Sequence, residues 1–216
     1  LNNRDLLKEI HRSKNTYCSY VDEESAQYDL ILPNLERVNI RTIAQAKRER
    51  ADRLAKNAYM EAIERGEKVK QAQFAIDWKK IKKEDLVFRI MTFDHVPLDP
   101  GRKRNPKTTA DHHERCNFPP FQHFKFDESG GLVCVGKSHW QGGMKNGYFA
   151  KDQGTINNNL ARMFMKLVER YATRSNWRGY TYNDEMKSTA LLQLAQIGLQ
   201  FDESKSSNPF AYYTAA

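Results

Sequence analysis

Side chains of metal-binding type gather in the middle of the chain, at His112, His113, Cys116, His123 and His139. Imidazole nitrogen and thiolate sulfur are common ligands of zinc, so this group is the first candidate for chemistry. Its spacing matches no zinc pattern, because adjacent histidines rarely point at one ion and no second Cys/His pair lies at a matching distance. We therefore predict no metal site and no cofactor. The alternative function is a metal-dependent nuclease or another nucleic-acid-processing protein that uses the His112 to His139 cluster.

Other catalytic patterns are missing from the sequence. It has no Ser/His/Asp nucleophile signature, no glycine-rich phosphate loop after a strand, and no paired carboxylates in a suitable context. We therefore predict that the protein is not an enzyme.

A cluster of cations interrupts the same region, at Arg102, Lys103, Arg104 and Lys107. Flexible cations in a loop can contact a phosphate backbone without reading bases, which makes these residues candidate phosphate contacts. A solvated loop explains them equally well at this stage.

Composition points toward acidic partners. The chain of 216 residues carries a net charge of +8, with 29% charged and 39% hydrophobic residues, and such a balance favours nucleic acid or an acidic protein face. No run of eighteen apolar residues and no secretion leader is evident, so we predict an intracellular protein without a membrane partner. The scattered cysteines fit reduced thiols in a cytoplasm.

The positions of the elements predict an α+β chain in two parts. Residues 1–155 are predicted to form a mixed N-terminal extension: a short helix at 2–14 capped by Asn3, strands within 16–35, a long basic helix at 39–65, and a small antiparallel sheet within 86–150. The polar stretch 151–159 marks the boundary, and residues 156–216 are predicted to form an all-α unit.

The C-terminal unit predicts three helices. The first follows the cap Asn157–Asn159, and the second starts with Thr181 and Asp184 in the manner of a capping box. The second helix is apolar on more than one side, so it is either central in a bundle or offers a surface to another protein. Asn208 and Pro209 start the third helix. Its aromatic residues are open to two interpretations, core packing or a platform for unstacked bases, and they are Phe210, Tyr212 and Tyr213.

The order of these short motifs resembles region 2 of sigma factors, and the likeness is greatest to the late-transcription sigma factors of T-even-type bacteriophages. The pattern is carried by GYTYNDEM, by FDESK and by NPFAYYT, and it covers roughly residues 159–216. The preceding part resembles the N-terminal extension of such factors from phages of cyanobacteria, chiefly in FDHVPLDPGRKRNPK and GKSHWQG.

The resemblance implies a factor that binds the host multisubunit RNA polymerase core in the cytoplasm of the infected bacterium and directs it to late promoters. In such factors the second helix docks on the clamp helices of the largest polymerase subunit. The corresponding residues here are Phe164, Glu185, Ser188, Thr189 and Leu191. Many sigma factors carry Gln, Glu or Asp at the positions of Ser188 and Thr189, so docking here would depend less on charge.

The same resemblance assigns contacts with melted promoter DNA to Phe210, Tyr212 and Tyr213. Base-reading residues, and a peptide that engages a phage sliding clamp or co-activator, would lie beyond Ala216. We accordingly expect residues before Leu1 and after Ala216. The sequence selects no role for the N-terminal extension.

Overall fold

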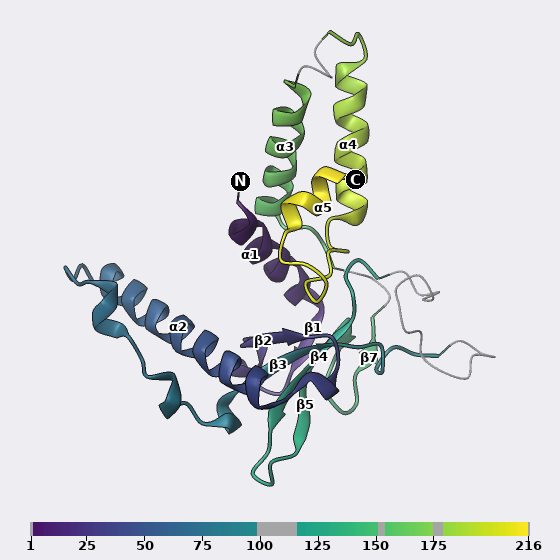
Figure 1. Cartoon of the computed structure of the whole chain (residues 1–216). Helices are drawn as coiled ribbons and strands as arrows, with labels where there is room; N and C mark the ends of the chain where they lie inside the picture. The colour runs from purple at the N-terminus through teal and green to yellow at the C-terminus, as the bar shows by residue number, and fades with distance from the viewer. Residues whose placement is uncertain (1, 99–115, 151–153, 175–178, 216) are drawn as a thin grey trace. The chain divides into compact units, whose positions relative to one another are not determined.

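The computed structural model describes residues 2–98, 116–150, 154–174 and 179–215, and it combines α-helices with a mixed β-sheet (Figure 1). Its contacts divide the chain into two compact units. Unit 1 comprises Leu1–Ser19, Phe93–Pro120 and Ser138–Ala216, and unit 2 comprises Tyr20–Thr92 and Phe121–Lys137. This division differs from the predicted boundary near residue 155, because both ends of the chain belong to one unit.

The larger sheet has five strands in the order β1-β5-β4-β3-β2. Their bounds are β1 Cys18–Tyr20, β2 Leu30–Leu32, β3 Val87–Met91, β4 Phe121–Phe126 and β5 Leu132–Ser138. The β3/β4 and β4/β5 pairs are antiparallel, whereas β2 and β3 are parallel. The prediction of an antiparallel sheet within residues 86–150 is confirmed for the β3/β4 and β4/β5 pairs, and the parallel strand β2 lies outside that range. A long crossover separates β2 from β3 in the chain, and such a connection allows parallel pairing.

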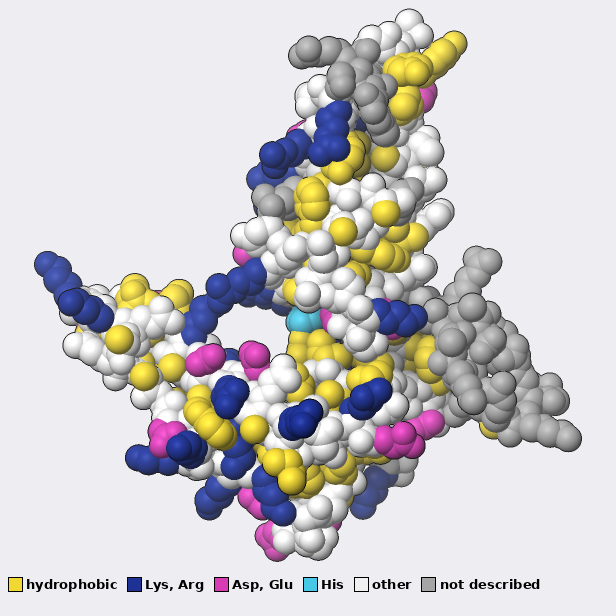
Figure 2. All heavy atoms as spheres, in the orientation of Figure 1, with side chains coloured by type: hydrophobic (Ala, Val, Ile, Leu, Met, Phe, Trp, Pro, Cys, Tyr) yellow, Lys and Arg dark blue, Asp and Glu magenta, His cyan; other side chains and the backbone are white. Residues whose placement is uncertain are grey.

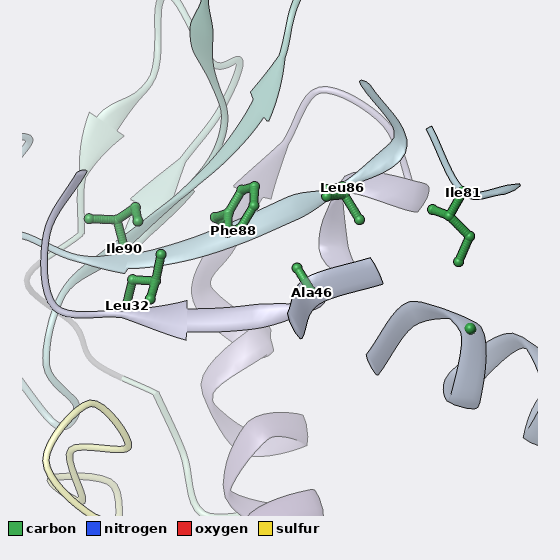
Figure 3. Packing of buried hydrophobic residues seen from close by; sticks show 7 residues of the cluster. Leu32, Ala46, Ile81, Leu86, Phe88 and Ile90 are labelled. Carbon is green, nitrogen blue, oxygen red and sulfur yellow. The ribbon is translucent and has the colours of Figure 1, made fainter. Parts of the chain in front are cut away.

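That crossover contains helix α2, Ile40–Glu64, as the apolar spacing predicted. Asn39 caps its start by accepting hydrogen bonds from the amides of Arg41 and Thr42, and Gly66 follows its end with φ of 80°. The small side chains of Ala46 and Ala51 let the helix pack closely in the core of unit 2 (Figure 3). The other buried members of this core are Leu32, Ile81, Leu86, Phe88 and Ile90.

Some of the basic residues of α2 serve the fold itself. Arg53 donates to Asp29 Oδ1 at 2.6 Å and Arg50 donates to Asp29 Oδ2 at 3.4 Å, while the backbone amide of Val87 also donates to Asp29 at 2.8 Å. The Asp29 carboxylate thus joins α2 to the start of β3. These two arginines are held by an internal carboxylate.

Unit 1 contains the other helices: α1 Asn3–Lys14, α3 Asn158–Ala172, α4 Asn183–Ile197 and α5 Pro209–Ala215. A two-stranded sheet of β6, Trp140–Gln141, and β7, Tyr148–Phe149, also belongs to it. The cap of α1 is Asn2, which accepts from the Asp5 amide at 2.8 Å, and not the predicted Asn3. Asn3 instead accepts from the amide of Phe210 at 3.0 Å, so its side chain joins the first helix to the last.

Buried polar contacts tie α1 to the C-terminal part of the chain. The Nζ of Lys14, whose residue has no exposed surface, donates to the Phe201 carbonyl and to Glu203 Oε1, each at 2.9 Å. His11 Nε2 lies 2.9 Å from the same carboxylate oxygen. Asn157 donates to Ser13 and Glu9, which fixes the start of α3 against α1. The predicted N-terminal helix is therefore structurally part of the C-terminal helical unit.

Candidate functional site

Helix α3 follows the predicted cap and supplies the apolar face against which the C-terminal helices pack. Asn157 caps it by accepting from the Leu160 amide at 2.8 Å, and its buried residues are Leu160, Phe164, Leu167, Val168 and Ala172. Phe164 is only 3% exposed, and its ring lies edge-on to that of Tyr213 with 4.9 Å between centroids. This differs from the docking role implied for Phe164, because a side chain in the core offers no surface to a partner.

The predicted cap of α4 is absent from the structure. The helix begins at Asn183 with Tyr182 at the cap position and no side-chain hydrogen bond there, so the Thr181/Asp184 capping box was wrong. Asp184 instead accepts from Lys187 Nζ at 2.8 Å, and this hydrogen bond together with the lysine charge lowers the pKa of Asp184. Asp184 and Glu185 still lie in the first turn, where a negative charge interacts favourably with the helix dipole and stabilises the helix.

One face of α4 is open within unit 1. Glu185, Ser188 and Thr189 are exposed, and Leu191 is partly buried. The hydroxyls of Ser188 and Thr189 donate to backbone carbonyls one turn earlier, each at 2.9 Å, so their oxygens remain available as acceptors. Leu192 is 64% exposed in the middle of this face. The surplus of apolar residues on the helix was visible in the sequence, but which leucine faces outward was not.

The opposite face of α4 packs on α3. Leu194 is the buried residue of the helix, at 5% exposure. It lines an apolar pocket of about 170 Å³ together with Leu167 and Val168 of α3, Ala190 of α4 and Tyr213 of α5. The helix is thus held to its own unit by one side, and the side that bears Glu185 and Leu192 is exposed.

Helix α5 begins where predicted, with the Asn208 side chain accepting from the Ala211 amide at 3.0 Å. The structure separates its three aromatic residues. Tyr213 is 3% exposed and its hydroxyl donates to the Gly198 carbonyl at 2.5 Å, while burial raises the pKa of that hydroxyl far above its ordinary value. Phe210 and Tyr212 are partly exposed, with Tyr212 lying 5.5 Å from the Phe201 ring. Core packing therefore explains Tyr213, and only the other two retain surface for stacking.

The metal-binding candidates do not assemble into a site in the part of the chain that is described. His112, His113 and the basic loop of Arg102, Lys103, Arg104 and Lys107 lie outside the described residues. Among the residues that are placed, no group of three or more His, Cys, Asp or Glu side chains could hold a metal ion. His139 is buried, stacks on Phe118 at 3.8 Å and has its Nε2 2.9 Å from the Phe118 carbonyl oxygen.

His123 takes part in a buried cluster that the sequence did not suggest. Arg89, on the neighbouring strand, has no exposed surface and donates from Nε to His123 Nε2 at 3.0 Å. Its guanidinium lies between the rings of Phe121 and Tyr28, at 3.8 Å and 4.0 Å from their centroids. Burial and the adjacent positive charge lower the pKa of His123 to about 3. The Nε2 lone pair of His123 already accepts from Arg89, and Nδ1 is paired with the Ser25 carbonyl, so neither ring nitrogen is available to a metal ion.

The surface of the molecule in Figure 2 shows Lys and Arg side chains along α3 and apolar side chains between the C-terminal helices. Across the described helices there is none whose length and apolar character would let it cross a lipid bilayer. No protein-family model, no curated protein and no solved structure matches the chain.

Proposed function

We propose that this protein is a late-transcription sigma factor of bacteriophage type. It binds the host RNA polymerase core in the infected bacterial cytoplasm, directs it to late promoters and assists promoter melting, and it has no catalytic activity of its own. The observation that carries the proposal is the open face of α4, which bears Glu185, Ser188, Thr189 and Leu192 opposite the buried Leu194.

The composition of this face suits docking on another protein. Positions 185, 188, 189 and 192 recur at helical spacing and so form one continuous surface. A large apolar side chain surrounded by polar ones is the usual anatomy of the centre of an interface. Leu192 supplies that apolar centre, while Glu185 at the helix start can meet a cation of the clamp helices.

The start of α5 supports the second half of the proposal. Phe210 and Tyr212 are both partly exposed on a helix whose third aromatic residue, Tyr213, is anchored in the core. Stacking of an unpaired base on such a ring contributes about 1–3 kcal/mol, which is comparable with the few kcal/mol needed to flip a base from the duplex. Two accessible rings therefore suffice to hold melted promoter bases inside the polymerase complex.

The direct test is run-off transcription by host core polymerase from late phage promoters, with and without the protein. Glu185→Lys should reduce capture of core polymerase at least tenfold, because it reverses the charge at the start of the docking face. Glu128→Lys is the matched control, since Glu128 is an exposed carboxylate on the turn between β4 and β5. Equal capture by the two variants would show that this face of α4 is not the docking surface.

A further inference from the structure

Helix α3 carries a row of cations on its outer surface. Arg162, Lys166 and Arg170 recur every four residues, and all three side chains are exposed. Residues four apart lie nearly above one another on an α-helix, so the three form one line, which we call the α3 basic stripe. Figure 2 shows Lys and Arg side chains gathered along this helix. The buried Leu160, Phe164 and Leu167 lie on the other side of the helix, so packing does not require these charges.

The fold does not neutralise the stripe. Some other cations of unit 1 have carboxylate partners: Lys187 lies 2.8 Å from Asp184, and Arg12 lies 2.8 Å from Glu9. Within the described residues, by contrast, none of the three stripe residues forms an ion pair. Like charges four apart on a helix repel each other and destabilise it. A polyanionic ligand would relieve that repulsion.

The geometry of the stripe suits a regular line of phosphates. A rise of 1.5 Å per residue places successive cations about 6 Å apart along the helix, and each strand of duplex DNA has one phosphate per roughly 3.4 Å of its axis, so successive cations would meet about every second phosphate. Two of the three cations are arginines, whose planar guanidinium binds phosphate through paired hydrogen bonds. The stripe could therefore follow one strand over a few nucleotides.

Within the described residues of α3 itself, a feature needed for binding single strands is lacking. Stacking of bases requires accessible aromatic rings, and the nearest one on α3, Tyr171, is partly buried and has the Arg174 guanidinium 4.0 Å from its ring centroid. We propose that the α3 basic stripe binds the sugar–phosphate backbone of duplex DNA without reading its bases. This goes beyond the proposed function, because it places a DNA contact on a different helix from both the docking face of α4 and the aromatic residues of α5.

The test measures binding of the full chain, without polymerase, to a fluorescent DNA duplex of arbitrary sequence over a range of salt concentrations. In the variant Arg162→Gln/Lys166→Gln/Arg170→Gln, affinity should fall and the slope of log K against log salt should become shallower by roughly 2 to 3, since each lost phosphate contact removes about 0.9. The matched control is Lys79→Gln/Lys80→Gln/Lys82→Gln, which removes three exposed charges from unit 2. It should leave the slope unchanged.

A variant that removes a negative charge from α3 should have the opposite effect on DNA binding. Glu169 is the only carboxylate of α3 and is exposed, so Glu169→Gln should tighten binding to the duplex by removing repulsion from the phosphates. Equal losses in the stripe and control variants would overturn the proposal, because net charge alone would explain them. Unchanged duplex binding with loss of polymerase capture would also overturn it, in favour of an acidic protein partner. A stronger effect of the stripe variant on a single strand would likewise contradict binding to a duplex.

Discussion

The contact between Arg89 and His123 determines the protonation of the histidine. The Nε of arginine can only donate, so His123 Nε2 must accept, and the ring proton lies on Nδ1. From there it is donated to the Ser25 carbonyl, at 2.6 Å. Among the residues that the structure describes, the Nη atoms of Arg89 have no hydrogen-bond partner, and the two aromatic faces that cover the guanidinium provide cation–π attraction instead.

The lowered pKa of His123 predicts a dependence of stability on pH. An unfolded histidine takes up a proton below about pH 6.5, whereas the folded one stays neutral down to about 3. Between these values the unfolded state binds more protons. The contribution of His123 to the free energy of unfolding is therefore fully present above pH 6.5, and it falls by about 1.4 kcal/mol for each pH unit below that value. Urea denaturation at pH 7 and pH 5 measures this loss.

The variant His123→Gln isolates the contribution of this one residue. Glutamine offers an oxygen to Arg89 and does not titrate, so the variant should lose about 2 kcal/mol less than the wild type between pH 7 and pH 5. The same dependence on pH in both proteins would contradict the assignment to His123.

Tyr213 and Phe210 should behave differently although both are aromatic residues of α5. Tyr213→Phe removes the hydrogen bond to Gly198 and should lower the free energy of unfolding by about 1 kcal/mol, with promoter opening unchanged. Phe210→Ala should reduce promoter opening, which permanganate reactivity of unpaired thymines detects, with a smaller effect on stability. The reverse pattern would show that Tyr213, rather than Phe210, contacts the melted strand.

At the scale of elements, the attachment of α1 rests on a buried ion pair. The Glu203 side chain is 4% exposed and meets both Lys14 and His11. Such a pair is costly to break from one side, because the remaining charge loses its partner in a medium of low polarity. Its role is to align α1 with the segment between α4 and α5.

This arrangement predicts strong coupling in a double-mutant cycle. Lys14→Met should lower the free energy of unfolding by about 3–5 kcal/mol, because it leaves the Glu203 carboxylate buried without its lysine. Lys14→Met/Glu203→Met should recover a large part of that loss, since both charges are gone. Additive effects of the two single substitutions, measured by chemical denaturation, would mean that the pair does not act as a unit.

For the whole molecule, the important fact is that unit 1 is built from both ends of the chain. Leu6 and Ile10 of α1 are at most 1% exposed, and α1 packs against α3 and α5. Residues 156–216 alone would therefore expose part of the core of α3. A deletion of residues 1–155 would remove both α1 and unit 2, so the effects of losing each could not be told apart.

We expect the fragment of residues 156–216 to be poorly helical when isolated, because short helices in water depend on packing for their stability. Circular dichroism should show less helix per residue than α3, α4 and α5 contribute in the full chain. Addition of a synthetic peptide of residues 1–19 should restore part of the helix signal. A fragment that is fully helical by itself would show that α1 is dispensable to this unit.

Local features could be predicted from the sequence because their causes lie within a few residues. Apolar spacing predicted α2, the cap at Asn157–Asn159 predicted α3, and the Asn208-Pro209 pair predicted α5. The outward cations of α3 and the mixed character of α4 are likewise consequences of helical periodicity. Where two side chains competed for a cap, as at Asn2 and Asn3, spacing alone did not decide between them.

The tertiary structure decided everything that depends on which distant segments meet. Arg89 and His123 are 34 residues apart and Lys14 and Glu203 are 189 apart, so no periodicity connects them. Tyr212 and Tyr213 are neighbours of the same type, yet only Tyr213 reaches the Gly198 carbonyl and enters the core. The sequence by itself determined that the C-terminal helices carry surplus apolar and aromatic surface. Only packing determined that Phe164 and Tyr213 are buried while Leu192 stays exposed, because burial depends on contacts between helices rather than on the order of residues within one.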